Sequence, residues 1–502
     1  MAVRQYIGAR YVTKIYENSI TPGSAEWEAG VTYEPLTLVT YNYSSYLSKK
    51  EVPGSIGDPA SNPAYWVVTG AYNGQIATLQ SEIDDLEGRY LVINVADLPK
   101  NWGLTNLVGD DNTDNAAAFN DLITYLNNNL DRPYRRTLFF PSGRYIFESK
   151  ISLPQYLTLQ GEGTLNTSIK TATMVDDAFI ECLGYNKIFD LNVQHIGPGV
   201  SNKHGIALLG IQCELARLRI YNFKNGIYMN DAGGTKTEQV YIESNISAFN
   251  GISMHGRCVS SKFFKTSIVA SGVTNGTGFH YVDGDRCMDM NFLLCESSQL
   301  RYGFIFHAGT TPYPGDITIN NCIFDGMHNS FVVVDSFNSD GNLNITDNWV
   351  NYDDVSSSTS IIDIDDSSNI SISGNRFESL NSGGTSNLHA VNVTNGKNIS
   401  IINNSLHNLK YAMIVNGAER LDASGNILDS NDTTAGNAFC NASGLESSSI
   451  INNKMHASTK YQYDALIYTT TNTIIKNNIF QSNAAISYSE ASCIIDDNIH
   501  TS

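Results

Sequence analysis

The sequence predicts an all-β chain dominated by a right-handed parallel β-helix of about a dozen coils. Three observations support this prediction: two rows of short strands recur every 20 to 30 residues, each strand alternates apolar and polar residues, and asparagine repeats at one register. Side chains alternate between two faces along a strand. A repeat of this period is typical of a solenoid, in which each coil buries its apolar face against its neighbours.

In the first row, a small residue opens each strand and a large apolar residue follows it. The small residues are Ala178, Gly205, Gly226, Gly251, Gly278, Gly303, Ser330, Ser360, Ala390, Ala412, Ala438, Ala465 and Ala485. The second row reads apolar-x-apolar-x-x-Asn-x-apolar, as in NISISGNRF and NISIINNSL. Its register residues are Cys322, Asn348, Asn375, Asn404, Asn426, Asn453, Asn478 and Asn498. We therefore expect two strands per coil, bends that asparagine tolerates, and amides stacked along the axis.

Composition limits the partners of the chain. The net charge of −19 disfavours binding to nucleic acid or to an anionic membrane, whereas a neutral glycan remains compatible with it. The eight cysteines lack zinc or CxxC spacing, so we expect buried free thiols and no metal or other cofactor. The N-terminus MAVRQYIGARY has no apolar signal-peptide core. These features favour a virion component that is assembled in the host cytoplasm and released by lysis.

Residues 1–71 differ from the repeat because they are rich in aromatic residues and proline. We expect a small β-module that resembles chitin-binding-type carbohydrate modules, whose pattern is W…G…Y…V-x-Y…Y…P…W. That resemblance implies that Trp27, Tyr41 and Trp66 stack on sugar rings. The alternatives are that these rings form the core of a tiny domain, which needs every large side chain it has, or that the module docks to the virion.

Residues 72–89 predict a short coiled-coil helix, because Ile76, Leu79, Ile83 and Leu86 are spaced as an a/d seam. Such a segment would align three chains, although a monomeric linker helix is the alternative. Together with residues 1–71, it would contact other tail or neck proteins of the virion.

Residues 90–150 predict the N-terminal cap of the β-helix, which continues over 151–502. An acidic-glycine turn over 109–114 precedes a helix over Asn115–Asn128, and the strands Thr137–Phe140 and Tyr145–Phe147 follow. The helix would cover the open edge of the first coil, with Ala116, Phe119, Ile123 and Leu126 as its buried stripe.

The run GDDNTDNAAAF…TLFFPSGRYIF resembles the start of the pectate-lyase-like superfamily found in phage tailspikes and pre-neck appendages. Asp111 stands where that family usually has a second glycine. The resemblance implies a capped β-helix, usually a homotrimer, on a fold that hosts lyases, hydrolases, esterases and binding proteins.

One outer face of the first row carries candidate binding residues. If the small residue sets the register, Tyr228, His255, His280 and His307 point outward in successive coils, near Arg257 and Arg286. We interpret this row as a glycan groove. In later coils the same register places Val332, Val334, Ile362, Ile364 and Ile414 outside, which predicts a subunit interface.

A glycosidase needs two carboxylates on one face. The candidates are Asp231, Asp283 and Asp285 at strand ends beside this row, together with Glu243 and Glu296. The sequence thus predicts a viral tailspike or appendage that recognises, and depolymerises by hydrolysis or elimination, a host-surface polysaccharide or wall glycopolymer. A non-enzymatic adhesion fibre and a soluble polysaccharide lyase or hydrolase are the alternatives.

Overall fold

The computed structural model describes residues 26–42, 44–71, 92–129, 136–172, 177–197, 203–286, 289–307, 315–337, 341–352, 359–380, 388–430, 438–457, 465–480, 486–488, 494–496 and 498–500. The side chains of residues 283–286 are not among the described parts. The chain divides into two compact units, residues 1–90 and 91–502. The predicted coiled-coil helix at 72–89 lies outside the described residues.

The first unit contains an antiparallel sheet with the strand order β1 (Leu38–Tyr41), β2 (Ser44–Ser48) and β3 (Trp66–Ala71). Tyr33, Val39, Tyr46, Val52 and Trp66 form its small core. Large aromatic side chains supply much of the buried surface because so short a segment has few other residues to bury.

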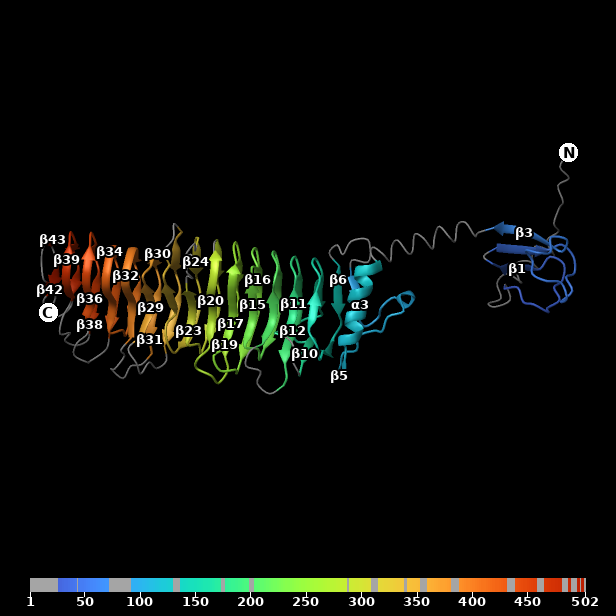
Figure 1. Ribbon diagram of the computed structural model, residues 1–502, viewed down its shortest axis with the longest axis horizontal. Coiled ribbons are helices and arrows are strands. Elements are labelled where there is room, and N and C mark those ends of the chain that lie inside the picture. The colour runs from blue at the N-terminus through green and yellow to red at the C-terminus, as the bar shows by residue number, and fades with distance from the viewer. Residues whose placement is uncertain are drawn as a thin grey trace, which may run out of the picture. The chain divides into compact units, whose positions relative to one another are not determined.

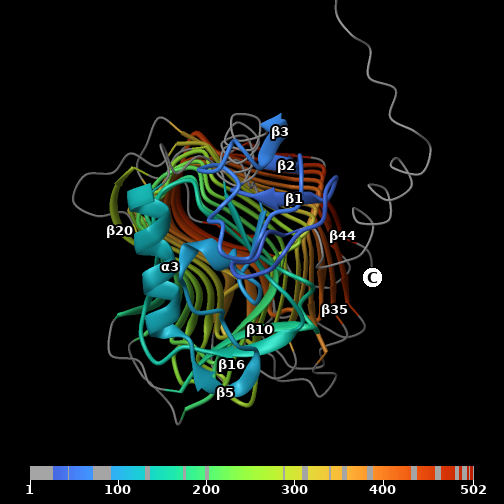
Figure 2. The same ribbon diagram turned by 90° about the vertical axis from the view of Figure 1, so that its right-hand side faces the viewer.

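The second unit is a parallel β-helix whose coils each contribute to three sheets (Figures 1 and 2). The first sheet contains the predicted first row. Its strands are β8 (Ile151–Leu153), β11 (Ala178–Cys182), β13 (His204–Leu208), β15 (Asn225–Asn230), β17 (Asn250–Arg257), β20 (Thr277–Arg286), β23 (Tyr302–His307), β26 (Val332–Asp335), β29 (Thr359–Asp365), the first parts of β32 (Leu388–Ile402) and β34 (Tyr411–Ser424), β36 (Ala438–Glu446), β39 (Ala465–Thr471) and β42 (Ile486–Tyr488).

The second sheet contains β4 (Val92–Asn94), β6 (Thr137–Phe140), β9 (Thr158–Gly161), the first parts of β12 (Lys187–His195), β14 (Glu214–Tyr221) and β16 (Lys236–Ser244), β18 (Lys262–Phe264), β21 (Met290–Leu293), β24 (Ile317–Asn320), β27 (Leu343–Thr346), β30 (Ser368–Ser373), the second parts of β32 and β34, β37 (Ser449–Ile451), β40 (Ile474–Lys476) and β43 (Ile494–Asp496).

The third sheet contains β5 (Asp110–Asp114), β7 (Gly143–Ile146), β10 (Thr167–Thr171), the second parts of β12, β14 and β16, β19 (Ser267–Ala270), β22 (Glu296–Ser298), β25 (Ile323–Met327), β28 (Trp349–Tyr352), β31 (Arg376–Ser379), β33 (Ser405–His407), β35 (Ile427–Ser430), β38 (Lys454–Ala457), β41 (Ile479–Phe480) and β44 (Ile499–His500). The prediction of two strands per coil is wrong, because the asparagine bend divides the second row into two strands.

The asparagine column is confirmed, and it turns the chain between the second and third sheets. The side-chain amide of Asn404 donates to Asn426 Oδ1 at 2.9 Å and to the carbonyl of Ile372 at 2.9 Å. The backbone N–H of Asn404 donates to the same Asn426 oxygen at 3.0 Å. The pattern repeats from Asn348 to Asn498, so these buried amides have their hydrogen-bonding groups satisfied.

Small residues open the first row because the corner before the first sheet is crowded. A Cβ atom on Gly251 would lie 2.5 Å from Cδ1 of Ile268, which belongs to the neighbouring third sheet. Inside the coils, aromatic rings stack between rungs, with 4.8 Å between the centroids of Phe279 and Phe304. The repeat therefore reflects close packing as well as strand alternation.

The predicted cap is confirmed as helix α3 (Ala116–Asn129), which follows β5, with a short 3₁₀ helix, η1 (Lys100–Trp102), further upstream. Phe119, Leu122 and Leu126 are its buried residues, while Ala116 and Ile123 are partly buried. Leu122 was therefore missing from the predicted stripe.

Asp111 shows why glycine is usual at its position, because its φ of 63° lies in the left-handed region. Its carboxylate pairs with Lys170 at 2.9 Å and Arg144 at 3.1 Å, which holds the pKa of Asp111 below its ordinary value. The ion pairs offset part of the strain of this departure from the family pattern.

The first row changes register after β23, which overturns the predicted aliphatic interface. Phe304 pairs with Val332 and not with Phe331, so strand β26 begins one residue later than the small residue Ser330 indicates. A slip of one residue exchanges the two faces of a strand. Val332, Val334, Ile362 and Ile364 are consequently buried in the core, and only Ile414 of that predicted stripe points outward.

The six described cysteines are buried free thiols, as expected for small core residues: Cys182, Cys213, Cys258, Cys295, Cys322 and Cys440. Within the described part of the chain, no helix combines the length and apolarity needed to cross a bilayer.

Candidate functional site

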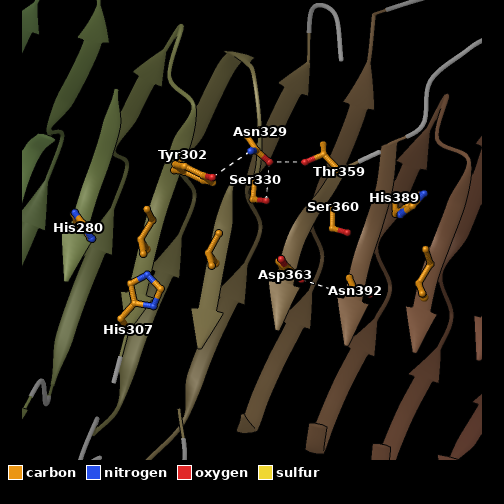
Figure 3. A pocket seen from close by; sticks show the side chains of 13 residues that line it. His280, Tyr302, His307, Asn329, Ser330, Thr359, Ser360, Asp363, His389 and Asn392 are labelled. Carbon is orange, nitrogen blue, oxygen red and sulfur yellow. Dashed lines mark hydrogen bonds between the residues drawn. The ribbon is translucent and has the colours of Figure 1, made fainter. Parts of the chain in front are cut away.

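A groove of about 740 Å³ runs along the outer face of the first sheet, from β20 to β34. Consecutive rungs of a parallel sheet lie about 4.8 Å apart, so the groove spans several rungs along the β-helix axis. Figure 3 shows that its labelled side chains come from neighbouring strands and from the bend before β26, and that they line one space. The lining residues are His280, Tyr302, Ile305, His307, Asn329, Ser330, Val333, Thr359, Ser360, Asp363, His389, Asn392 and Ile414.

A chain of hydrogen bonds fixes one edge of this groove (Figure 3). The amide of Asn329 donates to the hydroxyl of Tyr302 at 3.2 Å. Asn329 Oδ1 in turn accepts hydrogen bonds from the hydroxyls of Thr359 and Ser330. These bonds hold the half-exposed Tyr302 ring and the neighbouring polar groups in defined orientations before any ligand arrives.

Two of the four predicted binding residues line this groove. His280 and His307 lie at one end of it, with their ring centroids 6.3 Å apart. Tyr228 and His255 do not line it and instead lie in earlier coils, 4.9 Å apart between ring centroids. Tyr228 also stacks on His204 at 4.1 Å, so the predicted row is divided into two groups.

Burial keeps three imidazoles of this sheet, those of His204, His280 and His389, neutral at ordinary pH. It lowers the pKa of His280 and of His389 to about 4, and it does the same for His204 in the earlier group. A neutral imidazole has one donor and one acceptor nitrogen, which suits the hydroxyl groups of a sugar.

Three carboxylates that the sequence reasoning missed lie in or beside the groove. Asp363 accepts a hydrogen bond from the Asn392 amide at 2.7 Å (Figure 3). Asp335 lies 3.1 Å from Nδ1 of His307, and it pairs across the sheet with Asp365. Partial desolvation, followed by repulsion from neighbouring carboxylates, raises the pKa of Asp365 above its ordinary value.

The predicted acids do not form one cluster. Asp231 sits in a left-handed turn after β15, and its Oδ1 accepts the backbone N–H of Arg257 at 2.8 Å, so it shapes that turn. Glu243 and Glu296 lie on the third sheet, away from the histidines of the first sheet. Asp283, Asp285 and Arg286 are in strand β20, but their side chains lie outside the described residues.

The aromatic residues of the N-terminal module separate into two kinds. Trp66 is 2% exposed and packs edge-on against Tyr33, which removes its ring from the candidates for sugar stacking. Trp27 and Tyr41 are half-buried and form an edge-to-face pair with 5.2 Å between their centroids. The alternative of a core role thus holds for Trp66.

The described residues contain no group of three or more histidine, cysteine, aspartate or glutamate side chains placed to hold a metal ion. The groove offers hydroxyl, amide, imidazole and carboxylate groups, all of which form hydrogen bonds.

Comparison with known proteins agrees with the β-helix architecture. Residues 105–322 match the model of the rhamnogalacturonase A/epimerase, pectate lyase-like family. No curated protein matches the sequence.

Solved structures with this fold include phage tailspikes. The tailspike protein of E. coli bacteriophage HK620, in complex with a pentasaccharide, is 13% identical with a TM-score of 0.58, covering 82% of this chain and 79% of that chain. The bacteriophage phi29 gene product 12 is 15% identical with a TM-score of 0.55, covering 82% and 64%. Tailspike protein 3 of bacteriophage CBA120 is 13% identical with a TM-score of 0.51, covering 97% and 80%. The chain thus shares the β-helix fold of phage tailspikes.

Proposed function

We propose that the chain is a receptor-binding tailspike of a phage virion, and that the groove on the first sheet binds a polysaccharide of the host surface. The observation that carries this proposal is the groove from His280 to His389, in which pre-oriented polar side chains follow one another along the axis. A polymer lying along the axis would contact hydrogen-bonding groups from successive rungs, interspersed with the aliphatic side chains of Ile305 and Val333. The solved HK620 tailspike, which has the same fold and holds a pentasaccharide, supports this proposal.

The test of binding uses purified surface polysaccharides of the bacteria to which the phage adsorbs. Tyr302→Ala and Asn392→Ala each remove hydrogen-bonding groups from the groove. Each variant should lose about 1.4 kcal/mol of binding free energy, which corresponds to about tenfold weaker binding. Tyr241→Ala is the matched control, because Tyr241 is also half-buried on an outer face but belongs to the third sheet. Equal affinities for all these variants and the parent would contradict the proposal.

Depolymerisation is the second candidate function, and the carboxylates around β29 favour it. Asp363 and Asp365 are two residues apart on one strand, which places their Cα atoms about 6.7 Å apart, and inverting glycosidases hold their carboxyl groups about 6.5–9.5 Å apart. Asp335 and Asp365 are paired on adjacent rungs, with about 4.8 Å between their backbones, and retaining glycosidases hold their carboxyl groups about 5–5.5 Å apart. The raised pKa of Asp365 suits a general acid.

Cleavage is tested by measuring reducing ends released from the polysaccharide that binds. Asp365→Asn should lower the rate at least a hundredfold while leaving binding intact, and Asp422→Asn on the second sheet is the control. Inversion of the anomeric configuration in the first product would indicate the pair Asp363 and Asp365, and retention would indicate the pair Asp335 and Asp365. An unsaturated product would indicate a lyase. No release of either product by the parent protein would leave the adhesion fibre as the function.

Assembly and location belong to the same proposal. A homotrimer in the virion, attached to other tail or neck proteins through residues 1–90, matches the tailspike interpretation. Light scattering of the full chain should give the mass of three chains, each of 55.0 kDa. A monomeric mass would exclude a trimer, and absence of the protein from purified virions would exclude the location.

A further inference from the structure

We propose that the β-helix carries a second glycan site, separate from the groove on the first sheet, which binds an acidic sugar chain. A hollow of about 770 Å³ lies on the outside of the second sheet and the bend before it, across β9, β12, β14, β16 and β18. These strands lie near the N-terminal end of the β-helix (Figure 1). Four rung steps correspond to about 19 Å, the length of a short oligosaccharide.

Two stacked tyrosines form one wall of this second hollow. The rings of Tyr156 and Tyr185 lie 4.6 Å apart between centroids and are nearly parallel, at 16°. Both residues are half-buried, so part of each ring remains in contact with solvent. Aromatic rings of this kind offer an apolar surface to the face of a sugar ring and a hydroxyl to its edge.

The backbone at these tyrosines has a left-handed conformation, which makes tyrosine an unfavourable choice for this bend. Tyr156 has a φ of 68° and Tyr185 a φ of 55°, in the left-handed region that bulky side chains avoid. The same bend in later coils is made by Gln212, Gly234 and Ser260. Smaller or more polar residues therefore make the bend, and strain of this type is concentrated at functional sites.

Lysines form the floor of the hollow. Lys187, Lys236 and Lys262 are exposed and belong to one outward column of the second sheet, interrupted by Glu214. Glu214 pairs with Lys187 at 2.6 Å. In the described part of the chain, neither Lys236 nor Lys262 has a carboxylate within 4.0 Å. Two ammonium groups on adjacent rungs of a chain with a net charge of −19 are therefore available to an anionic ligand.

The stacked tyrosines and the adjacent lysines together favour an acidic glycan over a nucleic acid as the ligand of this hollow. A long nucleic acid would meet the repulsion of the whole acidic chain, whereas an oligosaccharide contacts only the local cluster. Carboxylates or phosphates on the sugars would pair with Lys236 and Lys262, and the sugar rings would stack on the tyrosines. The first groove lacks lysine and arginine among its lining residues, so the two sites differ in the charge of the ligand they accept.

The test is affinity electrophoresis of the full chain through gels that contain polygalacturonate, alginate or hyaluronate, with dextran as the neutral polymer. We expect at least one acidic polymer to retard the protein and dextran not to do so. Lys236→Gln combined with Lys262→Gln should weaken the retardation at least tenfold. Lys397→Gln combined with Lys454→Gln removes the same charge elsewhere on the β-helix and should leave it unchanged.

Tyr185→Asn separates a binding role from a structural role, because asparagine accepts the left-handed conformation readily. We expect this variant to lose retardation while its melting temperature stays the same or rises. A lower melting temperature of Tyr185→Asn with unchanged retardation would overturn the proposal. Failure of all three acidic polymers to retard the parent protein would also overturn it. A change in oligomeric mass on Lys236→Gln with Lys262→Gln would assign this face to a subunit contact and would also overturn it.

The two sites are tested independently. Tyr302→Ala in the first groove should leave retardation by acidic polymers unchanged, so failure of the first site and failure of the second are distinguishable.

Discussion

Substitution of Asn404 by alanine tests how much the asparagine column contributes to stability. Alanine would remove four hydrogen bonds: two that the Asn404 amide donates, to Asn426 and to the carbonyl of Ile372, and two that its oxygen accepts from Asn375. It would leave the backbone N–H of Asn375 buried without that acceptor. Four bonds at about 1 kcal/mol each give an expected loss of about 4 kcal/mol.

The assay is urea unfolding followed by far-ultraviolet circular dichroism, together with hydrogen exchange of peptides covering residues 365–430. A solenoid is stabilised mainly by contacts between neighbouring coils, so we expect faster exchange in the coils on either side of Asn404 before distant coils respond. Asn416→Ala is the control, because Asn416 is exposed and its side-chain oxygen accepts a hydrogen bond from the hydroxyl of Ser443 at 3.2 Å. Its cost should stay below about 0.5 kcal/mol.

An equal loss of unfolding free energy in Asn404→Ala and Asn416→Ala would contradict a stabilising role for the column. That result would mean that water or local rearrangement replaces the lost bonds, and that the column is a consequence of the bend and not a source of stability.

Three further outcomes follow from burial. Histidine has a pKa of about 6.5 in the unfolded chain, whereas burial lowers the pKa of His204, His280 and His389 to about 4 in the folded chain. Between these two pH values the unfolded state therefore binds more protons than the folded state. The melting temperature should therefore fall as pH falls from 6.5 to 4, and the fall should be smaller in His389→Gln. Gly251→Ala should cost about 1–3 kcal/mol in urea unfolding, because the new methyl group overpacks the corner; no loss would show that the corner relaxes. Burial raises the pKa of Cys440 to about 12, so a thiol reagent should label it only after unfolding; rapid labelling of the native protein would contradict its placement.

The fold could be predicted from the sequence because the patterns that specify it are local and recur in every coil. Strand alternation, the recurring small residues and the asparagine register each follow from packing that every coil repeats. The three-sheet cross-section was not predicted, because the two residues before each register asparagine, where residues such as Asn403 are left-handed, were interpreted as part of one strand.

The functional site was predicted only in part, since it depends on register between coils. His280 and His307 were found because their strands keep the register of the small residue. Asp335 and Asp363 were missed because Ser330 resembles the small residue that opens a strand, although β26 begins at Val332. The register taken from Ser330 placed Val332 and Val334 on the outer face. Aligning the buried positions of β26 with those of β23 would have corrected this register.

Glycan binding in the groove is tested most directly by a crystal structure of the full chain soaked with an oligosaccharide prepared from the host polysaccharide. We expect sugar density along the axis in the groove between His280 and His389, with hydroxyl groups hydrogen-bonded to Asn392 or Tyr302. Ordered sugar bound elsewhere, with that groove empty, would contradict this expectation.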